Sequence, residues 1–197
     1  MKVGEMQITE EHLRRIRIPK CHWRAELNRI PESCRHKSTI VRYCDDILNK
    51  IWEPTGLLLF GEYSSGKSAI GSICLKAAAA HGVIGYWISA GDLPRYQIEK
   101  EMFDDELTCY ERARTSSLLV IDEYYMRAEM KWTEDAVDAL VRARIDEEKC
   151  TIITTNHTPQ DIERNRPAMG AALHQATYPI KVLGHDFRKD IGKEMNI

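Results

Sequence analysis

The feature that most constrains this 197-residue chain is an eight-residue loop, GEYSSGKS, which directly follows the apolar run GLLLF. The loop begins at Gly61 and closes on Gly66, Lys67 and Ser68, which matches the spacing G-x-x-x-x-G-K-[ST]. Glycine permits backbone angles that other residues avoid, and it leaves room for an anion close to the main chain. The apolar run predicts a buried strand, and residues 68–80 predict a helix. A strand, a glycine-rich turn and a helix in this order predict a phosphate-binding loop.

The chemistry of phosphate binding explains this spacing. Successive backbone N–H groups of such a loop point at the phosphate, and the N-terminus of the following helix adds partial positive charge. The ammonium of Lys67 is expected to neutralise the β- and γ-phosphates, and the Ser68 hydroxyl is expected to ligate Mg²⁺. We therefore expect ATP and Mg²⁺ as cofactors. The predicted nucleotide contacts are Gly61, Glu62, Tyr63, Ser64, Ser65, Gly66, Lys67 and Ser68.

Two adjacent carboxylates, Asp122 and Glu123, end the apolar run LLVIDE. Neighbouring residues of a strand point to opposite faces, so we expect these two side chains to have different roles. Asp122 is expected to hold Mg²⁺ through water, and Glu123 is expected to accept a proton from an attacking water. A kinase for small molecules needs no water-activating glutamate here, whereas an ATP-hydrolysing protein does.

A further polar group ends the apolar run TIITTN at residues 151–156. If this strand lies between the strand of the phosphate loop and the strand of Asp122, Asn156 can reach the γ-phosphate and orient a water molecule. The alternative is that Asn156 only makes a turn before Pro159.

Strands and helices alternate along the rest of the chain. Helical spacing of apolar residues is visible at Ile40, Tyr43, Ile47 and Ile51. Further helices are predicted at 93–106 and 133–149, the second with Thr133 as its N-cap. Strands are predicted at 56–60, 83–89, 116–123 and 150–156, with a fifth at 179–184. This alternation predicts an α/β domain with a mostly parallel sheet.

Together these elements resemble the AAA+ family of P-loop ATPases, and more narrowly its DnaC/IstB-type helicase loaders and transposition ATPases. The resemblance is carried by the segments RIRIPKCHW, GEYSSGKS, LLVIDEYY, TIITTN and GHDFRKD, and it covers roughly residues 15–192. It implies an ASCE three-layer sandwich with a five-stranded sheet and no clear helical lid. The implied division is an N-terminal basic segment and helix at 1–50, an ATPase core at 51–192 and a tail at 193–197.

By the same resemblance, four residues outside the loop and the acidic pair receive roles. Ile18 and Pro19 would lie near the adenine, and Asn156 would be the polar sensor. Arg188 would be the second sensor, contacting phosphate from the C-terminal end.

The resemblance also implies an arginine finger, and here the sequence departs from the family's pattern. Members of this group carry a Gly-Glu-Arg…Arg box shortly before the last strand, which supplies an arginine to a neighbouring subunit. Here that region holds Arg164 and Arg166, followed by small residues. Either these arginines serve, or catalysis between subunits is weak.

Composition limits the kinds of protein that this chain can be. The formal net charge of −2 excludes a strongly basic nucleic-acid coat, although a local basic groove is compatible with it. The longest nearly apolar stretch, residues 77–91, contains His81 and is too short to span a membrane. A basic cluster surrounds Trp23, and it is either a DNA contact or a solvated face. Its members are Arg14, Arg15, Arg17, Lys20 and Arg24.

The six cysteines are scattered and form no C-x-x-C pair. We interpret them as reduced thiols of a cytoplasmic protein, in a bacterial or phage-infected cell by the resemblance. The alternative is a zinc site, although the spacing does not match a structural one. Its ligands would come from Cys21, His22, Cys34, His36 and Cys44.

These observations predict an ATP-hydrolysing AAA+ protein that acts on single-stranded DNA or on a DNA-bound partner in replication or transposition. The partner would be a replicative helicase or a transposase, and the active form would be a homo-oligomer. The alternatives are a nucleotide-gated interaction module that hydrolyses ATP very slowly and a small-molecule phosphotransferase.

Overall fold

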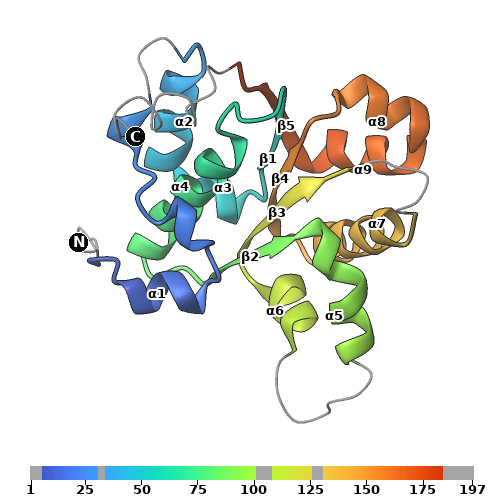
Figure 1. The fold of residues 1–197 in the computed structure, drawn as a ribbon, viewed down its shortest axis with the longest axis horizontal. Helices are drawn as coiled ribbons and strands as arrows, with labels where there is room; N and C mark the ends of the chain where they lie inside the picture. The colour runs from blue at the N-terminus through green and yellow to red at the C-terminus, as the bar shows by residue number, and fades with distance from the viewer. Residues whose placement is uncertain (1–5, 31–33, 101–107, 126–130, 184–197) are drawn as a thin grey trace, which may run out of the picture.

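A five-stranded parallel sheet forms the centre of the computed structural model, which describes residues 6–30, 34–100, 108–125 and 131–183 (Figure 1). The strand order is β2-β3-β4-β1-β5, and every pairing is parallel. The predicted α/β class and the five strands are confirmed, and β4 lies between β1 and β3, which is the condition set for Asn156 to reach a phosphate. The strands are β1 (Gly56–Phe60), β2 (Gly85–Ser89), β3 (Leu118–Tyr124), β4 (Cys150–Thr155) and β5 (Thr177–Lys181).

Helices cover both faces of the sheet, which gives the three layers of the fold (Figure 1). Side chains alternate along β1, so that Leu57 and Leu59 join one hydrophobic cluster and Leu58 joins the other. The first cluster packs against α2 (Lys37–Asp45), α3 (Ile47–Trp52) and α4 (Lys67–Ala80). The second packs against α5 (Leu93–Lys100), α6 (Cys109–Thr115), α7 (Lys131–Asp146), α8 (Pro159–Asn165) and α9 (Pro167–Ala176).

The N-terminal residues pack on the same side of the sheet as α4. They form α1 (Glu10–Arg15) and the short 3₁₀ turns η1 (Lys20–His22) and η2 (Leu27–Arg29). The ammonium of Lys76 in α4 donates to the carbonyl oxygens of Trp23, at 3.2 Å, and of Ala25. The carbonyl of Ile16 accepts from the Trp87 N–H at 2.9 Å. This backbone N–H lies on the edge of β2 that has no neighbouring strand, so the N-terminal segment supplies its partner. The division of the chain at residue 50 stays a prediction.

Some predicted boundaries were wrong. Helix α7 begins at Lys131, so Thr133 lies within its first turn and is not its N-cap. The helical pattern at 40–51 forms two helices, α2 and α3, which are separated at Asp46. The sequence analysis missed α1, α6, α8 and α9, which are short or rich in small residues, and the turn η3 (Ala90–Asp92). Residues 101–106 of the predicted helix at 93–106 lie outside the described part.

A fully buried arginine connects the helices of the second layer to the sheet. Arg144 in α7 donates to the carbonyl oxygens of Ala113, Ser116 and Cys150 at 2.6–2.9 Å, and to the Thr151 hydroxyl at 2.9 Å. Burial lowers the pKa of Arg144 to about 9, which still leaves it charged at neutral pH. The guanidinium therefore provides hydrogen-bond donors both to carbonyl oxygens at the C-terminal end of α6 and to a carbonyl oxygen at the start of β4.

Within the described ranges, no helix has both the length and the apolar character that a membrane span requires.

Candidate functional site

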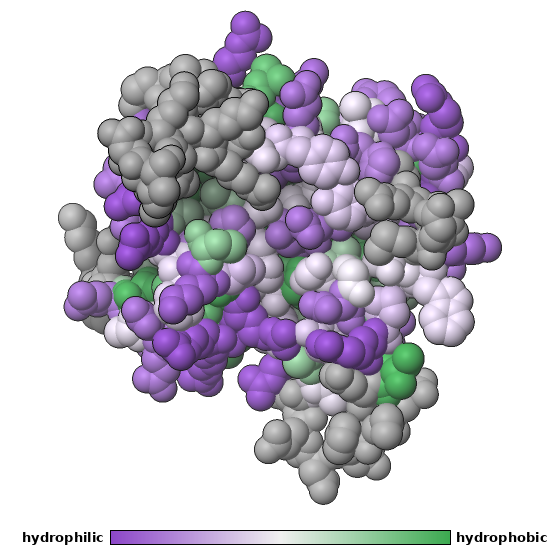
Figure 2. Space-filling view, viewed as in Figure 1, coloured by the Kyte–Doolittle hydropathy of each residue, from purple (hydrophilic) through white to green (hydrophobic). Residues whose placement is uncertain are grey.

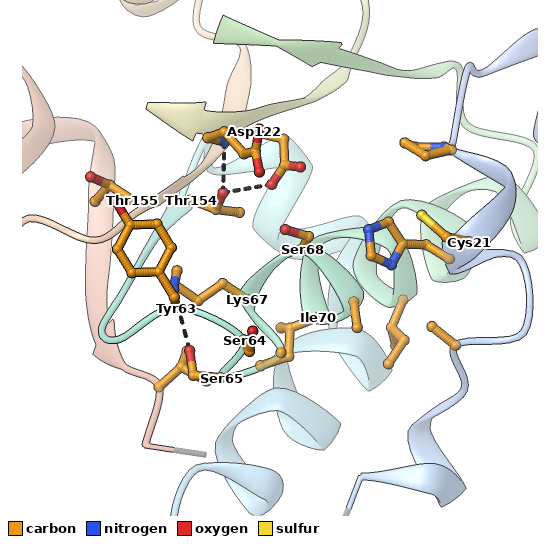
Figure 3. A pocket seen from close by; sticks show the side chains of 18 of the residues that line it. Cys21, Tyr63, Ser64, Ser65, Lys67, Ser68, Ile70, Asp122, Thr154 and Thr155 are labelled. Atoms are coloured by element: carbon orange, nitrogen blue, oxygen red, sulfur yellow. Dashed lines mark hydrogen bonds between the residues drawn. The ribbon is translucent and has the colours of Figure 1, made fainter. Parts of the chain in front are cut away.

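The carboxyl ends of β1, β3 and β4 meet at a cavity of about 1450 Å³ (Figure 3). Ligands of open parallel sheets bind at this edge, where the loops of neighbouring strands diverge. The cavity is lined by the phosphate loop, by the polar ends of β3 and β4, and by part of the N-terminal segment. The polar lining residues contributed by the phosphate loop, the start of α4 and the ends of β3 and β4 include Ser64, Ser65, Lys67, Ser68, Asp122, Glu123, Thr154, Thr155 and Asn156.

The two glycines of the loop occupy positions that other residues fit poorly. Gly61 has a φ of 141°, and a Cβ added there would lie 2.4 Å from the carbonyl oxygen of Val182. Gly66 has a φ of 94° and is the N-cap of α4, where it offers no side chain to the N–H groups of the first turn. These donors remain for a ligand, and the 14-residue helix adds its dipole. The predicted strand, loop and helix are therefore present.

Lys67 lies between the loop and the two carboxylates. Its ammonium donates to the carbonyl oxygens of Gly61 at 3.0 Å and of Glu62 at 2.6 Å, and the side chain is 8% exposed. Burial lowers the pKa of Lys67, while Asp122 and Glu123 act in the opposite direction. A cation at this place can bind an anion that enters the loop.

The end of β3 departs from regular strand geometry. The register between β3 and β4 shifts between Ile121 and Tyr124, so that Asp122 and Glu123 both stand opposite Thr154. Glu123 has a φ of 60°, which is uncommon for a residue other than glycine. Both carboxylates line the same cavity, so the opposite faces expected for strand neighbours are not found. Asp122 is buried, whereas Glu123 is exposed to the cavity.

Thr154 joins these two residues, and sequence reasoning gave it no role. Its hydroxyl donates to Asp122 Oδ1 at 2.6 Å and accepts from the Glu123 N–H at 3.0 Å (Figure 3). The signal in the sequence was the pair of threonines before Asn156, because a central strand seldom ends in polar side chains without a partner for them.

Asn156 follows β4 and lines the cavity, as the strand order led us to expect. The turn that begins α8 is capped by Thr158, which exchanges hydrogen bonds with Asp161. Asn156 therefore has no part in that cap. Tyr125, a residue that the sequence analysis did not single out, lines the same cavity.

The two residues predicted to lie near the adenine differ in their surroundings. Pro19 lines the cavity together with Cys21 and His22, and in Figure 3 Cys21 and Tyr63 stand on opposite sides of Ser68. Ile18 is 3% exposed and belongs to the hydrophobic cluster beneath. The contact of Ile18 with the adenine therefore stays a prediction. Because its side chain is buried, such a contact would have to be made by its backbone.

The basic cluster of the N-terminal segment is partly engaged within the chain. Figure 2 shows hydrophilic side chains over this part of the molecule. The guanidinium of Arg14 lies 5.3 Å from the centre of the Trp23 ring and also pairs with Glu10. Arg17 donates to the hydroxyl of Tyr96 at 2.5 Å. These contacts support the interpretation as a solvated, structural face for these two arginines.

The candidate arginines before β5 are not equivalent. Arg166 forms ion pairs with Asp135 at 2.7 Å, Glu134 at 3.4 Å and Asp138 at 3.5 Å, all on α7. Arg164 is exposed on α8. Arg188 and the expectation about a helical lid lie outside the described residues.

The donor set fits magnesium better than zinc. Ser68 and Asp122 line one cavity, and hydroxyl and carboxylate oxygens are the ligands that Mg²⁺ prefers. In the ranges that the structure describes, no group of three or more His, Cys, Asp or Glu side chains could hold a metal ion. Of the cysteines considered for zinc, Cys44 is buried and hydrogen-bonded to Cys74, with 3.8 Å between the sulfur atoms.

Comparison with solved structures places this geometry in a known fold. A crystal structure of the DnaC helicase loader matches with a TM-score of 0.72 and 21% identity, over 84% of this chain and 100% of that one. A crystal structure of DnaI matches with a TM-score of 0.69 and 16% identity, over 85% and 93% of the two chains. The replication initiator DnaA bound to AMPPCP and single-stranded DNA matches with a TM-score of 0.65 and 16% identity, over 88% and 56%.

The chain therefore has the AAA+ P-loop fold that these proteins share, and the resemblance in fold expected from the sequence is confirmed. No protein-family model matches the sequence, and no curated protein matches it either.

Proposed function

We propose that this protein is a Mg²⁺-dependent ATPase of the helicase-loader kind, which acts on single-stranded DNA or on a DNA-bound partner in replication or transposition. One observation carries this proposal. A phosphate loop with Lys67, the acidic pair Asp122 and Glu123, and Asn156 all line one cavity at the carboxyl ends of three neighbouring strands. This is the set of groups that hydrolysis of a phosphoanhydride by water requires.

Each residue has a distinct task in this proposal. The loop amides and Lys67 bind the β- and γ-phosphates, and Ser68 and Asp122 would hold the metal. Mg²⁺, when bound, supplies positive charge that offsets the charge developing on the phosphate oxygens. Glu123 accepts the proton of the attacking water, because its carboxylate is exposed to the cavity and is not engaged by Thr154, which bonds only to its N–H.

The structural neighbours support the choice of nucleotide and of partner. The DnaA structure contains AMPPCP, an analogue of ATP, together with single-stranded DNA. The DnaC structure is that of a helicase loader. A replicative helicase is therefore the first partner to test, and a transposase is the second.

The arginines before β5 bear on how fast an isolated subunit can hydrolyse ATP. An arginine supplied by a neighbour can raise the rate of P-loop enzymes by roughly 10³–10⁵. Arg166 is held by three carboxylates of its own chain, so Arg164 is the better candidate for this role. We infer that a single subunit turns over slowly and that assembly into a homo-oligomer raises the rate. The slow, nucleotide-gated interaction module is the second candidate function, and the ion pairs of Arg166 favour it.

The test is the rate of phosphate release from ATP as protein concentration rises, with and without single-stranded DNA and with no other phosphate acceptor. The proposal predicts slow release by dilute protein and faster release when subunits assemble. Arg164→Ala should remove only that increase, and Arg188→Ala should lower nucleotide affinity or basal turnover at all concentrations. Arg42→Ala, on the exposed side of α2, is the control.

Fast release that is independent of concentration would contradict the assembly model. A dependence on an added small-molecule acceptor would favour the phosphotransferase. ATP binding with no turnover in any condition would favour the interaction module.

A further inference from the structure

The cavity has a second end, beyond the phosphate loop. In Figure 3, Ser68 separates Cys21 at this end from Tyr63 and Lys67. The lining here comes from the N-terminal segment and from one side of α4, and it includes Pro19, Cys21, His22, Ala25, Ile70 and Ile73. A largely apolar wall with a few polar groups suits the base of a nucleotide whose phosphates lie in the loop.

The N-terminal part of this wall is a single turn, residues 19–25, built around η1. Its backbone bonds are short-range: the His22 N–H donates to the Pro19 carbonyl at 2.9 Å, and the Ala25 N–H donates to the His22 carbonyl at 3.1 Å. Neither end of η1 has a side-chain cap. Bonds within the turn give it a shape, but they do not fix its place relative to α4.

Lys76 of α4 supplies a bond between the two. Its ammonium donates to the carbonyl oxygens of His22 at 3.4 Å, of Trp23 at 3.2 Å and of Ala25. An ammonium has three hydrogen-bond donors, and these three acceptors all belong to the one turn. The side chain is partly buried, and burial lowers its pKa. The cation therefore serves to hold the turn against the helix.

The place of Lys76 along α4 connects the two ends of the cavity. Ala69, Ile73 and Lys76 are spaced as i, i+4 and i+7, so they lie on one face of the helix. The first two line the cavity. The same helix begins with Lys67 and Ser68 at the phosphate loop. One 14-residue helix thus carries the phosphate end and, through Lys76, sets the place of the turn at the other end.

We propose that Lys76 is a positioning residue that holds the turn at 19–25 at the distance from the phosphate loop that the base of a bound nucleotide requires. This inference rests on the proposed function. It adds that Lys76 contributes to binding of the nucleoside part and not of the phosphates. Without Lys76 the turn must be ordered when the nucleotide binds, and that cost lowers the affinity. A ligand made only of phosphates does not reach the turn and carries no such cost.

The experiment compares AMPPCP with inorganic tripolyphosphate, which has neither base nor ribose. Calorimetric titrations of the full chain in Mg²⁺ measure both affinities. Lys76→Met keeps an unbranched side chain and removes the ammonium. We expect about 10-fold weaker binding of AMPPCP and unchanged binding of tripolyphosphate, which also shows that the variant is folded. Lys50→Met on α3 removes an ammonium that pairs with Asp46 at 3.3 Å, and it is the matched control.

A second variant loosens the same turn at another bond. The indole N–H of Trp23 donates to the Ile18 carbonyl at 2.8 Å, and Trp23→Phe removes this bond but keeps an aromatic ring. It should weaken AMPPCP binding and leave tripolyphosphate binding unchanged. This variant decides the question if Lys76→Met does not fold.

The inference is overturned if Lys76→Met binds AMPPCP as tightly as the wild type. It is also overturned if the variant loses affinity for both ligands by the same factor, because that is a general structural effect. A wild-type protein that binds tripolyphosphate as tightly as AMPPCP makes no use of the second end, which overturns the inference but leaves the phosphate loop intact. Binding of neither ligand by the wild type contradicts the proposed function itself.

Discussion

The hydroxyl of Thr154 donates a hydrogen bond of 2.6 Å to Oδ1 of Asp122. The hydroxyl oxygen of Thr154 also accepts from the backbone N–H of Glu123 at 3.0 Å, and Thr154 is 1% exposed. One buried side chain of β4 thus fixes the carboxylate proposed to hold the metal and the backbone of the proposed general base. At the irregular end of β3 the Glu123 N–H bonds to this hydroxyl and not to a backbone carbonyl of β4. The hydroxyl therefore stabilises the irregularity by giving a buried N–H a partner.

Replacing Thr154 by valine should disturb both neighbours. Thr154→Val keeps the shape but leaves a buried carboxylate oxygen and a backbone N–H without their partner, which costs about 1–3 kcal/mol. We expect a lower midpoint in urea and a higher Mg²⁺ concentration for half-maximal ATPase activity. Thr154→Ser restores the hydroxyl and should recover both. A valine variant with wild-type stability and Mg²⁺ dependence would show that the contact is incidental.

Removing the loop ammonium should separate binding from folding. Lys67→Ala should weaken ATP binding roughly 10–100-fold, because charge-assisted hydrogen bonds to phosphate are lost. The fold should remain, since the partners of Lys67 in the loop are carbonyl oxygens that can turn to water. Calorimetric titration with ATP measures the affinity, and Lys181→Ala on exposed β5 is the control. Undiminished affinity in Lys67→Ala would refute the phosphate-loop assignment.

The buried arginine should matter for stability and for nothing else. Arg144→Leu leaves the carbonyl oxygens of Ala113, Ser116 and Cys150 unsatisfied, and we expect a loss of at least about 3 kcal/mol in the free energy of unfolding. Arg142→Leu, on the same helix, removes an exposed pair with Asp138 and should cost under ~1 kcal/mol. Equal denaturation midpoints for the two variants would contradict this account.

Most of the fold could be predicted because its signals are local. Apolar runs marked the strands, and GEYSSGKS required a strand before it and a helix after it. The position of β4 between β1 and β3 entered the sequence analysis only as the condition under which Asn156 could approach a phosphate, and the structure meets that condition.

The parts that could not be predicted depend on contacts between distant residues. Regular alternation places Asp122 and Glu123 on opposite faces, and only Thr154, more than thirty residues later, shows why both face the cavity. The stack of Tyr63 on Tyr125 likewise joins two segments that have no common pattern. Helix α9 reads PAMGAALHQA, whose small residues give little periodicity to recognise.

The central claim is that this cavity binds ATP and that Glu123 activates the water that cleaves it. Its most direct test is the single-turnover rate of phosphate release by Glu123→Gln and by the wild type, at protein concentrations that saturate ATP and with single-stranded DNA present. Glu163→Gln, exposed on α8, is the matched control. The account predicts that Glu123→Gln binds ATP as tightly as the wild type and releases phosphate about 10²–10⁴ times more slowly. A Glu123→Gln variant that releases phosphate at the wild-type rate would contradict it.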